Sequence, residues 1–494
     1  MASSEESEPK DAAPGLPGQH KDDDGNDAPV AARRPSSPPL SADYDEPDDY
    51  ANLDETIDVS PIQNPYEQPI HRYESLEQTR SRDQRFRRRE SEIQRQLAAA
   101  AAAAAPPAEE EKDHVKPRVS RLATQIYTVS YLILFSILGT LARLGLQALT
   151  SSYPGAPVLF ASLWPNFAGS LIMGFLAEDR MLFRHDWGLS TNPTPTPAPI
   201  ATTADEEENH SSGSGSGTSS STDPATLKKS HATLKKTIPL YIGLATGFCG
   251  SLTSFSSFIR DMFLALSNDL SPSAPRGDGY SLTSVLAVLL VTISLSLSAL
   301  FLGAHLAIAL AHLPRPLRIP PSFTHTILDR AAVFLGLGCW LAAVLLCILP
   351  PDRASGTPSE ERYRGTATFA LAFAPLGCLA RFYASLRLNG RIASFPLGTF
   401  AVNVAGSAVL AVLWDLQHLP AGGVIGCQVL QGLQDGFCGC LTTVSTWVAE
   451  LAALRRRHAY VYGGASVGVA FGVVVAVMGG LRWGKGWEAV VCLH

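Results

Sequence analysis

Long uncharged blocks of apolar residues alternate with short polar segments over most of the chain after residue 120. A helix needs about 20 apolar residues to cross the hydrocarbon layer of a membrane, because lipid offers no partner to an unpaired backbone group. Nine stretches meet this requirement: 124–148, 157–176, 238–259, 281–312, 327–349, 365–386, 394–414, 423–449 and 459–481. The pattern therefore predicts an all-α membrane protein with nine transmembrane helices, grouped as four, one and four.

The polar parts of the chain have a different composition. Residues 1–120 are rich in Asp, Glu, Arg, Ser and Pro and poor in large apolar residues, so we expect a disordered tail. Residues 185–236 are rich in Ser, Gly, Thr and Pro, which predicts a flexible loop. The predicted domains are a tail at 1–120, a first four-helix repeat at 121–312, a connector at 313–364 with its helix at 327–349, and a second repeat at 365–494.

Charge and cysteine content narrow the possible functions. The net charge of -6 arises from mixed clusters, so no nucleic acid partner is expected. The eight cysteines lie mostly in apolar stretches without a CxxC pair or nearby histidines, which predicts buried small hydrophobic side chains. No nucleophile–base set or nucleotide motif occurs, so we predict neither an enzyme nor an ATP-driven pump.

The distribution of Lys and Arg predicts the orientation. No apolar signal segment follows Met1, so we expect the tail to stay in the cytosol. Alternation of the helices then places most basic residues near helix ends on the cytosolic side and the C-terminus outside, while the loops at 149–156 and 415–422 carry no Lys or Arg. Because a single helix separates the two four-helix units, the second unit enters the membrane upside down, as an inverted repeat.

Duplication is visible directly in the sequence. GLATGFCGSLTSFSSFIRD at 243–261 matches GLQDGFCGCLTTVSTWVAE at 432–450, with nine of 19 positions identical. Two shorter matches precede it in the same order: GTLAR at 139–143 with GCLAR at 377–381, and NFAGS at 166–170 with NVAGS at 403–407. The repeated Gly-rich segments predict a broken third helix in each repeat.

At these motifs the chain resembles the CrcB-type fluoride channels, and it resembles most closely their eukaryotic, fused-repeat form. The resemblance covers 124–312 and 365–481, and the helix at 327–349 resembles the connector between fused units. It implies a fluoride-selective channel in the plasma membrane that exports fluoride from the cytosol down its electrochemical gradient and confers fluoride resistance. It also implies a monomer that acts as a pseudo-dimer in the lipid bilayer.

Fluoride is small and strongly hydrated, so its path must replace water with donors that do not trap the ion. Asn166 and Asn403 each place an amide at membrane depth, and Ser170 and Ser407 follow one helical turn later. The resemblance implies that the asparagines line the pores. Hydrogen bonding between helices is the alternative.

Aromatic edges can also face an anion. Phe255 and Phe258 share a helix face, and the resemblance implies that each pore takes one aromatic ring from each half. The second half has Val444 and Trp447 instead, so we expect Phe255 to pair with Trp447, and we do not expect both pores to conduct. Hydroxyl groups beside these rings supply further donors, unless they bond only their own backbone: Ser256, Ser257, Ser445 and Thr446.

Charged groups inside the membrane are usually functional. Arg143 and Arg381 are expected to attract anions at vestibules, with extension toward the membrane interface as the alternative. Asp435 stands where the first repeat has Thr246; it could bond near a cation site, be protonated, or mark a degraded pore.

The resemblance further implies a structural Na⁺ ion where the two broken helices meet. Its ligands carry over to the backbone carbonyls of Gly250, Thr253, Gly439 and Thr442, and close packing through glycine is the alternative. Two other functions compete with a channel. Small multidrug exporters have similar four-helix subunits but carry a Glu in the first helix, where this chain has Arg. A membrane scaffold would act through the tail and the loop at 185–236.

Overall fold

The computed structural model describes residues 119–151, 160–179, 182–183, 235, 237–270, 279–310, 323–349, 367–419 and 423–490. All of them belong to one compact unit, Leu40–His494. Nearly all of the predicted tail and of the loop at 185–236 lies outside the described residues, so the expectations for these segments remain predictions. Within the described ranges every element is a helix.

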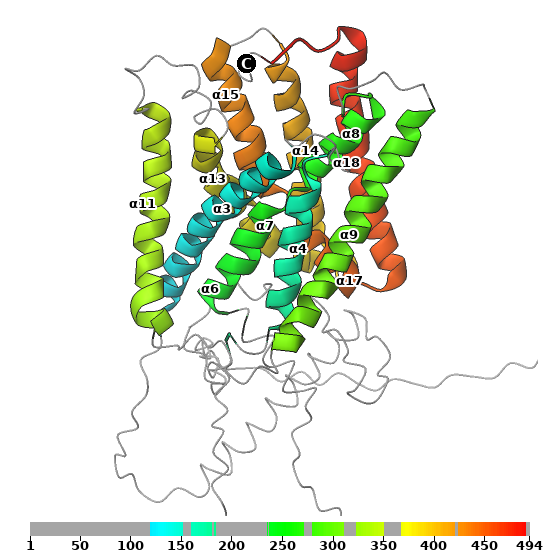
Figure 1. Ribbon diagram of the computed structural model, residues 1–494. Helices are drawn as coiled ribbons and strands as arrows, with labels where there is room; N and C mark the ends of the chain where they lie inside the picture. The colour runs from blue at the N-terminus through cyan, green and yellow to red at the C-terminus, as the bar shows by residue number, and fades with distance from the viewer. Residues whose placement is uncertain are drawn as a thin grey trace, which may run out of the picture. The chain divides into compact units, whose positions relative to one another are not determined.

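The helices follow the predicted stretches closely (Figure 1). The first group contains α3 (Arg121–Ser151), α4 (Leu163–Glu178), α6 (Pro239–Ile242), the π-helix η3 (Gly243–Cys249), α7 (Gly250–Leu252), α8 (Phe255–Leu266) and α9 (Tyr280–Leu310). The connector contains η4 (Thr324–Leu328) and α11 (Asp329–Ile348). The second group contains α13 (Phe369–Leu388), η6 (Asn389–Arg391), α14 (Leu397–Gln417), α15 (Gly423–Gly432), η7 (Leu433–Cys438), α16 (Gly439–Leu441), α17 (Ser445–Ala453) and α18 (Arg456–Gly484).

Seven of the helices in the described part are long and apolar enough to cross a membrane. They are α3, the run Pro239–Leu266, α9, Thr324–Ile348, Phe369–Arg391, α14 and α18. The connector is mostly exposed apolar surface, with 79% of Phe334 accessible, as expected for a helix that faces lipid. The chain is therefore a multi-pass membrane protein. The count of nine spans is not confirmed, because α4 has only 16 residues and Gly423–Ala453 is divided into short helical pieces.

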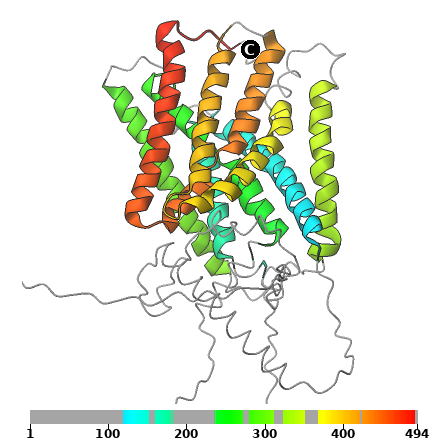
Figure 2. The same cartoon turned by 180° about the vertical axis from the view of Figure 1, so that it is seen from behind.

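Equivalent helices of the two groups make equivalent contacts. In each group the first helix packs on the π-helix, and the second helix packs on the fourth (α4 on α9, α14 on α18). The segments after the breaks cross over: α8 contacts α14 and α18, and α17 contacts α4 and α9. Figures 1 and 2 show the run from α6 to α8 ascending while the run from α15 to α17 descends. Each group thus completes the packing of the other.

The connector packs on α3 and α13. A buried hydrogen bond fixes its position, because the Tyr131 hydroxyl donates to Asp329 Oδ1 at 3.0 Å. Asp329 is fully buried. The connector is therefore attached to the first helix by a specific polar contact as well as by apolar packing.

The prediction for the cysteines is right in part. Cys249, Cys378, Cys438 and Cys440 are buried, as expected of small hydrophobic side chains. The prediction is wrong for Cys339, which is exposed, and for Cys427, which is buried but disulfide-bonded. Cys427 lies in the first half of α15, and α15 begins at the same end of the molecule as the last turns of α14 (Figure 1).

Candidate functional site

Each broken helix becomes extended at a threonine. Thr253 has ψ 149° and Thr442 has ψ 152°, so helical hydrogen bonding stops after a π-helix and one further turn. The hydroxyl of Ser254 then caps α8 by accepting a bond from the backbone N–H of Ser257. Both interruptions predicted from the Gly-rich segments are present.

The two asparagines bind backbone amides at these breaks. Asn166 Oδ1 accepts a hydrogen bond from the backbone N–H of Ser254 at 2.9 Å, and Asn403 Oδ1 accepts the equivalent bond from Thr443 at 2.9 Å. Both asparagines are fully buried. Their carbonyl oxygens therefore have a structural role in both repeats, which is the alternative interpretation weighed from the sequence.

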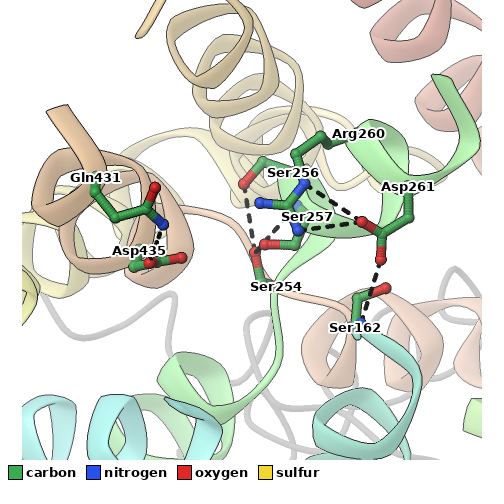
Figure 3. A network of polar contacts seen from close by, with 8 residues as sticks. All are labelled: Ser162, Ser254, Ser256, Ser257, Arg260, Asp261, Gln431 and Asp435. Atoms are coloured by element: carbon green, nitrogen blue, oxygen red, sulfur yellow. Dashed lines mark hydrogen bonds and ion pairs between the residues drawn. The ribbon is translucent and has the colours of Figure 1, made fainter. Parts of the chain in front are cut away.

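The two breaks are joined by hydroxyl groups arranged in matching pairs. Thr253 Oγ1 lies 3.1 Å from Ser445 Oγ, and Thr442 Oγ1 lies 3.0 Å from Ser256 Oγ. The Ser257 hydroxyl accepts a bond from its neighbour Ser254 (Figure 3). Three hydroxyls predicted to line the fluoride path therefore already have protein partners, while Thr446 is only partly buried.

The two arginines reach across the repeats. The Arg381 guanidinium donates to the backbone carbonyl of Thr246 at 2.8 Å, and that of Arg143 donates to the backbone carbonyl of Asp435. Arg143 is 1% exposed and Arg381 2%, so neither side chain extends to the membrane interface. Each guanidinium satisfies a carbonyl in the π-helical region of the opposite repeat, a contact that the sequence did not suggest.

Two glycines make this crossing possible. A Cβ atom on Gly250 would overlap the guanidinium of Arg381, and one on Gly439 would overlap that of Arg143. A side chain at either position would therefore displace the guanidinium from its carbonyl partner. The repeated Gly and Arg of the motifs are therefore a matched set.

The first repeat carries a group of buried donors without partners. Asn166 Nδ2 and the hydroxyl of Ser170 on α4 have no hydrogen-bond partner among the described residues, nor do the hydroxyls of Thr292 and Ser296 on α9. The two helices pack against each other. Sequence reasoning missed Thr292 and Ser296, although their spacing of four places two hydroxyls on one face of an apolar helix.

The equivalent groups of the second repeat are satisfied internally. Asn403 Nδ2 donates to the carbonyl of Thr443 at 3.2 Å, and the Ser407 hydroxyl donates to the carbonyl of Asn403 at 2.7 Å. On α18, Ser466 donates to the carbonyl of Tyr462 at 2.7 Å. The two repeats are thus similar in fold but unequal in available donors.

The aromatic rings meet as expected. The rings of Phe255 and Trp447 lie 5.2 Å apart at 71°, and those of Phe255 and Phe258 lie 5.7 Å apart at 81°. The Trp447 indole N–H is buried, and no described residue accepts a bond from it. Val444 is fully buried. The predicted pairing of Phe255 with Trp447 is therefore present, whereas a role in conduction is not tested by it.

Asp435 ends a chain of side-chain amides. Gln434 donates to Gln417 at 2.8 Å, Gln417 donates to Gln431 at 2.9 Å, and Gln431 donates to Asp435 Oδ2 at 2.6 Å. Figure 3 shows the last of these bonds, with the Gln431 amide pointing at the carboxylate. The carboxylate is therefore held in place by polar groups, at the residue whose backbone receives Arg143.

A second pair of carboxylates lies at equivalent positions in α8 and α17. Asp261 accepts bonds from the backbone N–H of Ser162 and from Arg260, as Figure 3 shows. Glu450 accepts bonds from the hydroxyls of Thr399 and Tyr462, both at 2.6 Å. Each acid thus connects the segment after the break to the start of the second helix of its repeat.

A cation site at the breaks would have to use backbone oxygens, because the described residues contain no group of three or more His, Cys, Asp or Glu side chains able to hold a metal. The amides that would bind four carbonyls in an uninterrupted helix bind side-chain oxygens instead. The carbonyls released in this way include those of Gly250, Thr253, Gly439 and Thr442. By the same argument those of Leu252, Cys440 and Leu441 are released too, because the amides of Ser256, Val444 and Ser445 also bind threonine hydroxyls. The first four are the carbonyls that the sequence resemblance implies as Na⁺ ligands, and carbonyl oxygen is a type of ligand that hard cations take.

Comparison with known proteins gives consistent results. A family model described as CrcB-like protein, Camphor Resistance (CrcB), matches residues 130–304 and 368–480. Fluoride export protein 1 of Neurospora crassa is 59% identical over 480 residues, which is 94% of this chain and 87% of that protein. Fluoride export protein 1 of Candida albicans is 33% identical over 363 residues, or 72% of this chain and 79% of that protein.

A shorter bacterial relative matches one part of the chain. Fluoride-specific ion channel FluC 1 of Symbiobacterium thermophilum is 38% identical over 114 residues, which is 22% of this chain and 90% of that protein. No solved structure matches the chain.

Proposed function

The chain belongs to the CrcB-like family, and we propose on that basis that it is a fluoride-selective channel that exports fluoride from the cytosol and confers fluoride resistance. Export is passive in this proposal. The membrane potential drives it, at about 2.3 kcal/mol per charge for each 100 mV. The relatives named as fluoride export proteins support this function.

The observation that supports a specific path is the set of donors on α4 and α9 that have no partner in the described part of the chain. Buried polar groups normally have partners, because an unsatisfied donor costs about 1–3 kcal/mol. Asn166, Ser170, Thr292 and Ser296 would recover that energy by donating to a dehydrated anion. We therefore place the fluoride path along α4 and α9, and assign the equivalent path along α14 and α18 little or no conduction.

The buried arginines contribute positive potential to the approach of the anion. Arg143 Nη1 and Arg381 Nη1 find no hydrogen-bond partner in the described part of the chain. A guanidinium with an unpaired donor in a nonpolar setting attracts anions over several ångströms. In the proposed channel they act at the two vestibules, one for each side of the membrane.

The proposed architecture has nine membrane crossings in two inverted repeats, so that one chain acts as a pseudo-dimer. The opposite directions of the two broken helices (Figures 1 and 2) and the exchanged contacts of α8 and α17 support it. A structural Na⁺ ion at the released carbonyls of the breaks would hold the two halves together. The ion is proposed as a fixed support, since nothing in the path along α4 and α9 requires it to move.

The proposed orientation has a cytosolic N-terminus and an extracellular C-terminus in the plasma membrane. The disulfide of Cys427 supports it, because disulfides persist mainly on the oxidising side of a membrane. The start of α15 would then face the outside, in agreement with the distribution of Lys and Arg.

Fluoride efflux from liposomes that contain the purified protein tests the function directly. We expect a flux of fluoride that exceeds that of chloride by orders of magnitude and does not depend on a proton gradient. Flux that requires a proton gradient would instead favour a transporter similar to the small multidrug exporters. Fluoride resistance lost after deletion of the tail and of 185–236, with flux intact, would favour a scaffold.

A further inference from the structure

An aromatic cluster near the C-terminus joins the two repeats. Trp487 follows α18, and its indole N–H donates to Asp415 Oδ1, in the last turn of α14, at 3.3 Å. The Trp487 ring lies 5.0 Å from that of His418 at the end of α14 and 6.0 Å from that of Phe263 in α8. Because α8 belongs to the first repeat and α14 to the second, one side chain contacts both repeats.

An ion pair strengthens the same junction. Arg482, in the last turn of α18, donates to both carboxylate oxygens of Asp269, which follows α8, at 2.8 and 2.9 Å. A bidentate pair of this kind fixes orientation as well as distance. The Arg482 guanidinium also lies 5.6 Å from the centroid of the Trp487 ring, where a cation and an aromatic face attract each other. The segment after α18 is therefore held against the ends of α8 and α14.

The disulfide of Cys427 has one candidate partner in this chain. Of the eight cysteines in the sequence, Cys427 is disulfide-bonded and these are free: Cys249, Cys339, Cys347, Cys378, Cys438 and Cys440. The remaining cysteine is Cys492, which lies outside the described residues and follows Trp487 in the sequence.

The described contacts place Cys427 within reach of that cysteine. The Gln417 amide donates to Cys427 Sγ at 3.6 Å, and Gln417 shares the last turn of α14 with Asp415, the partner of Trp487. The two side chains leave α14 on different sides, and a helix with its side chains is about 10–12 Å across. Five residues of extended chain span up to about 17 Å. Figures 1 and 2 show the segment after α18 crossing the end of α14 toward the start of α15.

We propose that Cys427 forms its disulfide with Cys492, and that this bond and Trp487 together clasp the two repeats at one end of the protein. The bond forms when the two thiols lose two protons and two electrons, and the disulfide of a thiol oxidoreductase accepts them and becomes a dithiol. This exchange takes place on the oxidising side of the membrane, where the proposed orientation puts the start of α15. The clasp does not depend on fluoride as the permeant ion.

The two parts of the clasp support each other. The disulfide closes a long loop, which reduces the conformational entropy of the unfolded chain and stabilises the folded one. The docked Trp487 keeps the ends of the bond close together, so a sulfur that has been released by a reductant meets its partner again at high effective concentration. The disulfide should therefore resist reduction more than it would without the aromatic contacts.

Peptide mapping of the full-length protein without reductant tests the pairing. We expect one cross-linked pair of peptides that contains Cys427 and Cys492, and its separation into two thiol peptides after reduction. Alkylation of Cys492 in the unreduced protein would overturn the inference, and so would a Cys427 peptide cross-linked to another cysteine.

Thermal unfolding in detergent tests what the bond does. Reductant should lower the melting temperature by roughly 5 °C, and Cys492→Ser should lower it equally and abolish the effect of reductant. The matched control Cys339→Ser removes an exposed free thiol and should change neither result. Trp487→Ala should keep the cross-link but speed its opening by a water-soluble reductant roughly three- to tenfold.

A melting temperature unaffected by reductant, or an opening rate that does not depend on Trp487, would overturn the clasp. Failure of the proposed function is distinguishable, because it would appear as the absence of fluoride flux from liposomes and would leave the cross-link and the melting temperatures unchanged.

Discussion

Replacing each asparagine by aspartate separates the two functions of its amide. Aspartate keeps the oxygen that accepts the bond from the break, made at 2.9 Å in both repeats, but it removes the amide donor. In Asn166→Asp the lost donor had no partner among the residues that the structure describes. In Asn403→Asp the lost donor bound the Thr443 carbonyl at 3.2 Å. The first substitution should therefore affect fluoride flux and the second mainly stability.

The expected sizes differ enough to be measured. A hydrogen bond to a charged partner is worth about 1.5–3 kcal/mol, so loss of the Asn166 donor alone should reduce flux about 10- to 100-fold. An ionised carboxylate about 4 Å from the anion adds roughly 4 kcal/mol of repulsion at an effective dielectric constant of about 20. Asn403→Asp should instead lower stability by about 1–3 kcal/mol, because the new oxygen faces a buried carbonyl.

Fluoride efflux per folded protein, measured in liposomes, should therefore fall below detection in Asn166→Asp and stay within about threefold of the unmodified value in Asn403→Asp. Thermal unfolding in detergent should show the larger loss of stability in Asn403→Asp. Loss of flux in Asn403→Asp with flux retained in Asn166→Asp would refute the reasoning and place the path along α14 and α18.

Three further substitutions test the framework around the path. Gly250→Ala should lower stability by roughly 3 kcal/mol or prevent folding, because its Cβ overlaps the Arg381 guanidinium; thermal unfolding measures this. Glu450→Ala should cost about 3 kcal/mol, since two buried hydroxyl donors lose their acceptor, and Glu450→Gln should recover part of it in the same assay. Tyr131→Phe removes the donor to Asp329 and should cost about 1–3 kcal/mol while the fluoride-to-chloride flux ratio stays unchanged.

The repeated motifs allowed much of the fold to be predicted. Hydropathy located the helices to within a few residues, and the Gly-rich segments located both breaks. Both were predictable because an unpaired backbone group is costly in lipid, so membrane helices need long apolar runs and breaks need special residues. The pairing of Phe255 with Trp447 followed from the family resemblance applied to the two halves, and their rings are in contact. These features depend on local composition or on direct comparison of the two halves.

Contacts between distant segments could not be predicted in the same way. Arg143 binds a carbonyl 292 residues away, and no local pattern indicates which backbone group a buried cation will satisfy. Thr292 and Ser296 were hidden by the high hydropathy of α9. The Cys427 disulfide was missed because a cysteine in an apolar helix has the same sequence pattern whether or not it is oxidised.

Comparison of the repeats separates structural from functional residues. The features kept in both halves are the glycines beside the guanidiniums, the arginines that cross over, and the asparagine oxygens that hold the breaks. Each half needs them because the packing of one half depends on the other. Nothing in that packing requires Asn166 Nδ2 to be unpaired or Asp435 to be acidic. Differences between equivalent positions are therefore the place to look for pore-specific behaviour in a fused channel, since a symmetric dimer of identical subunits cannot contain them.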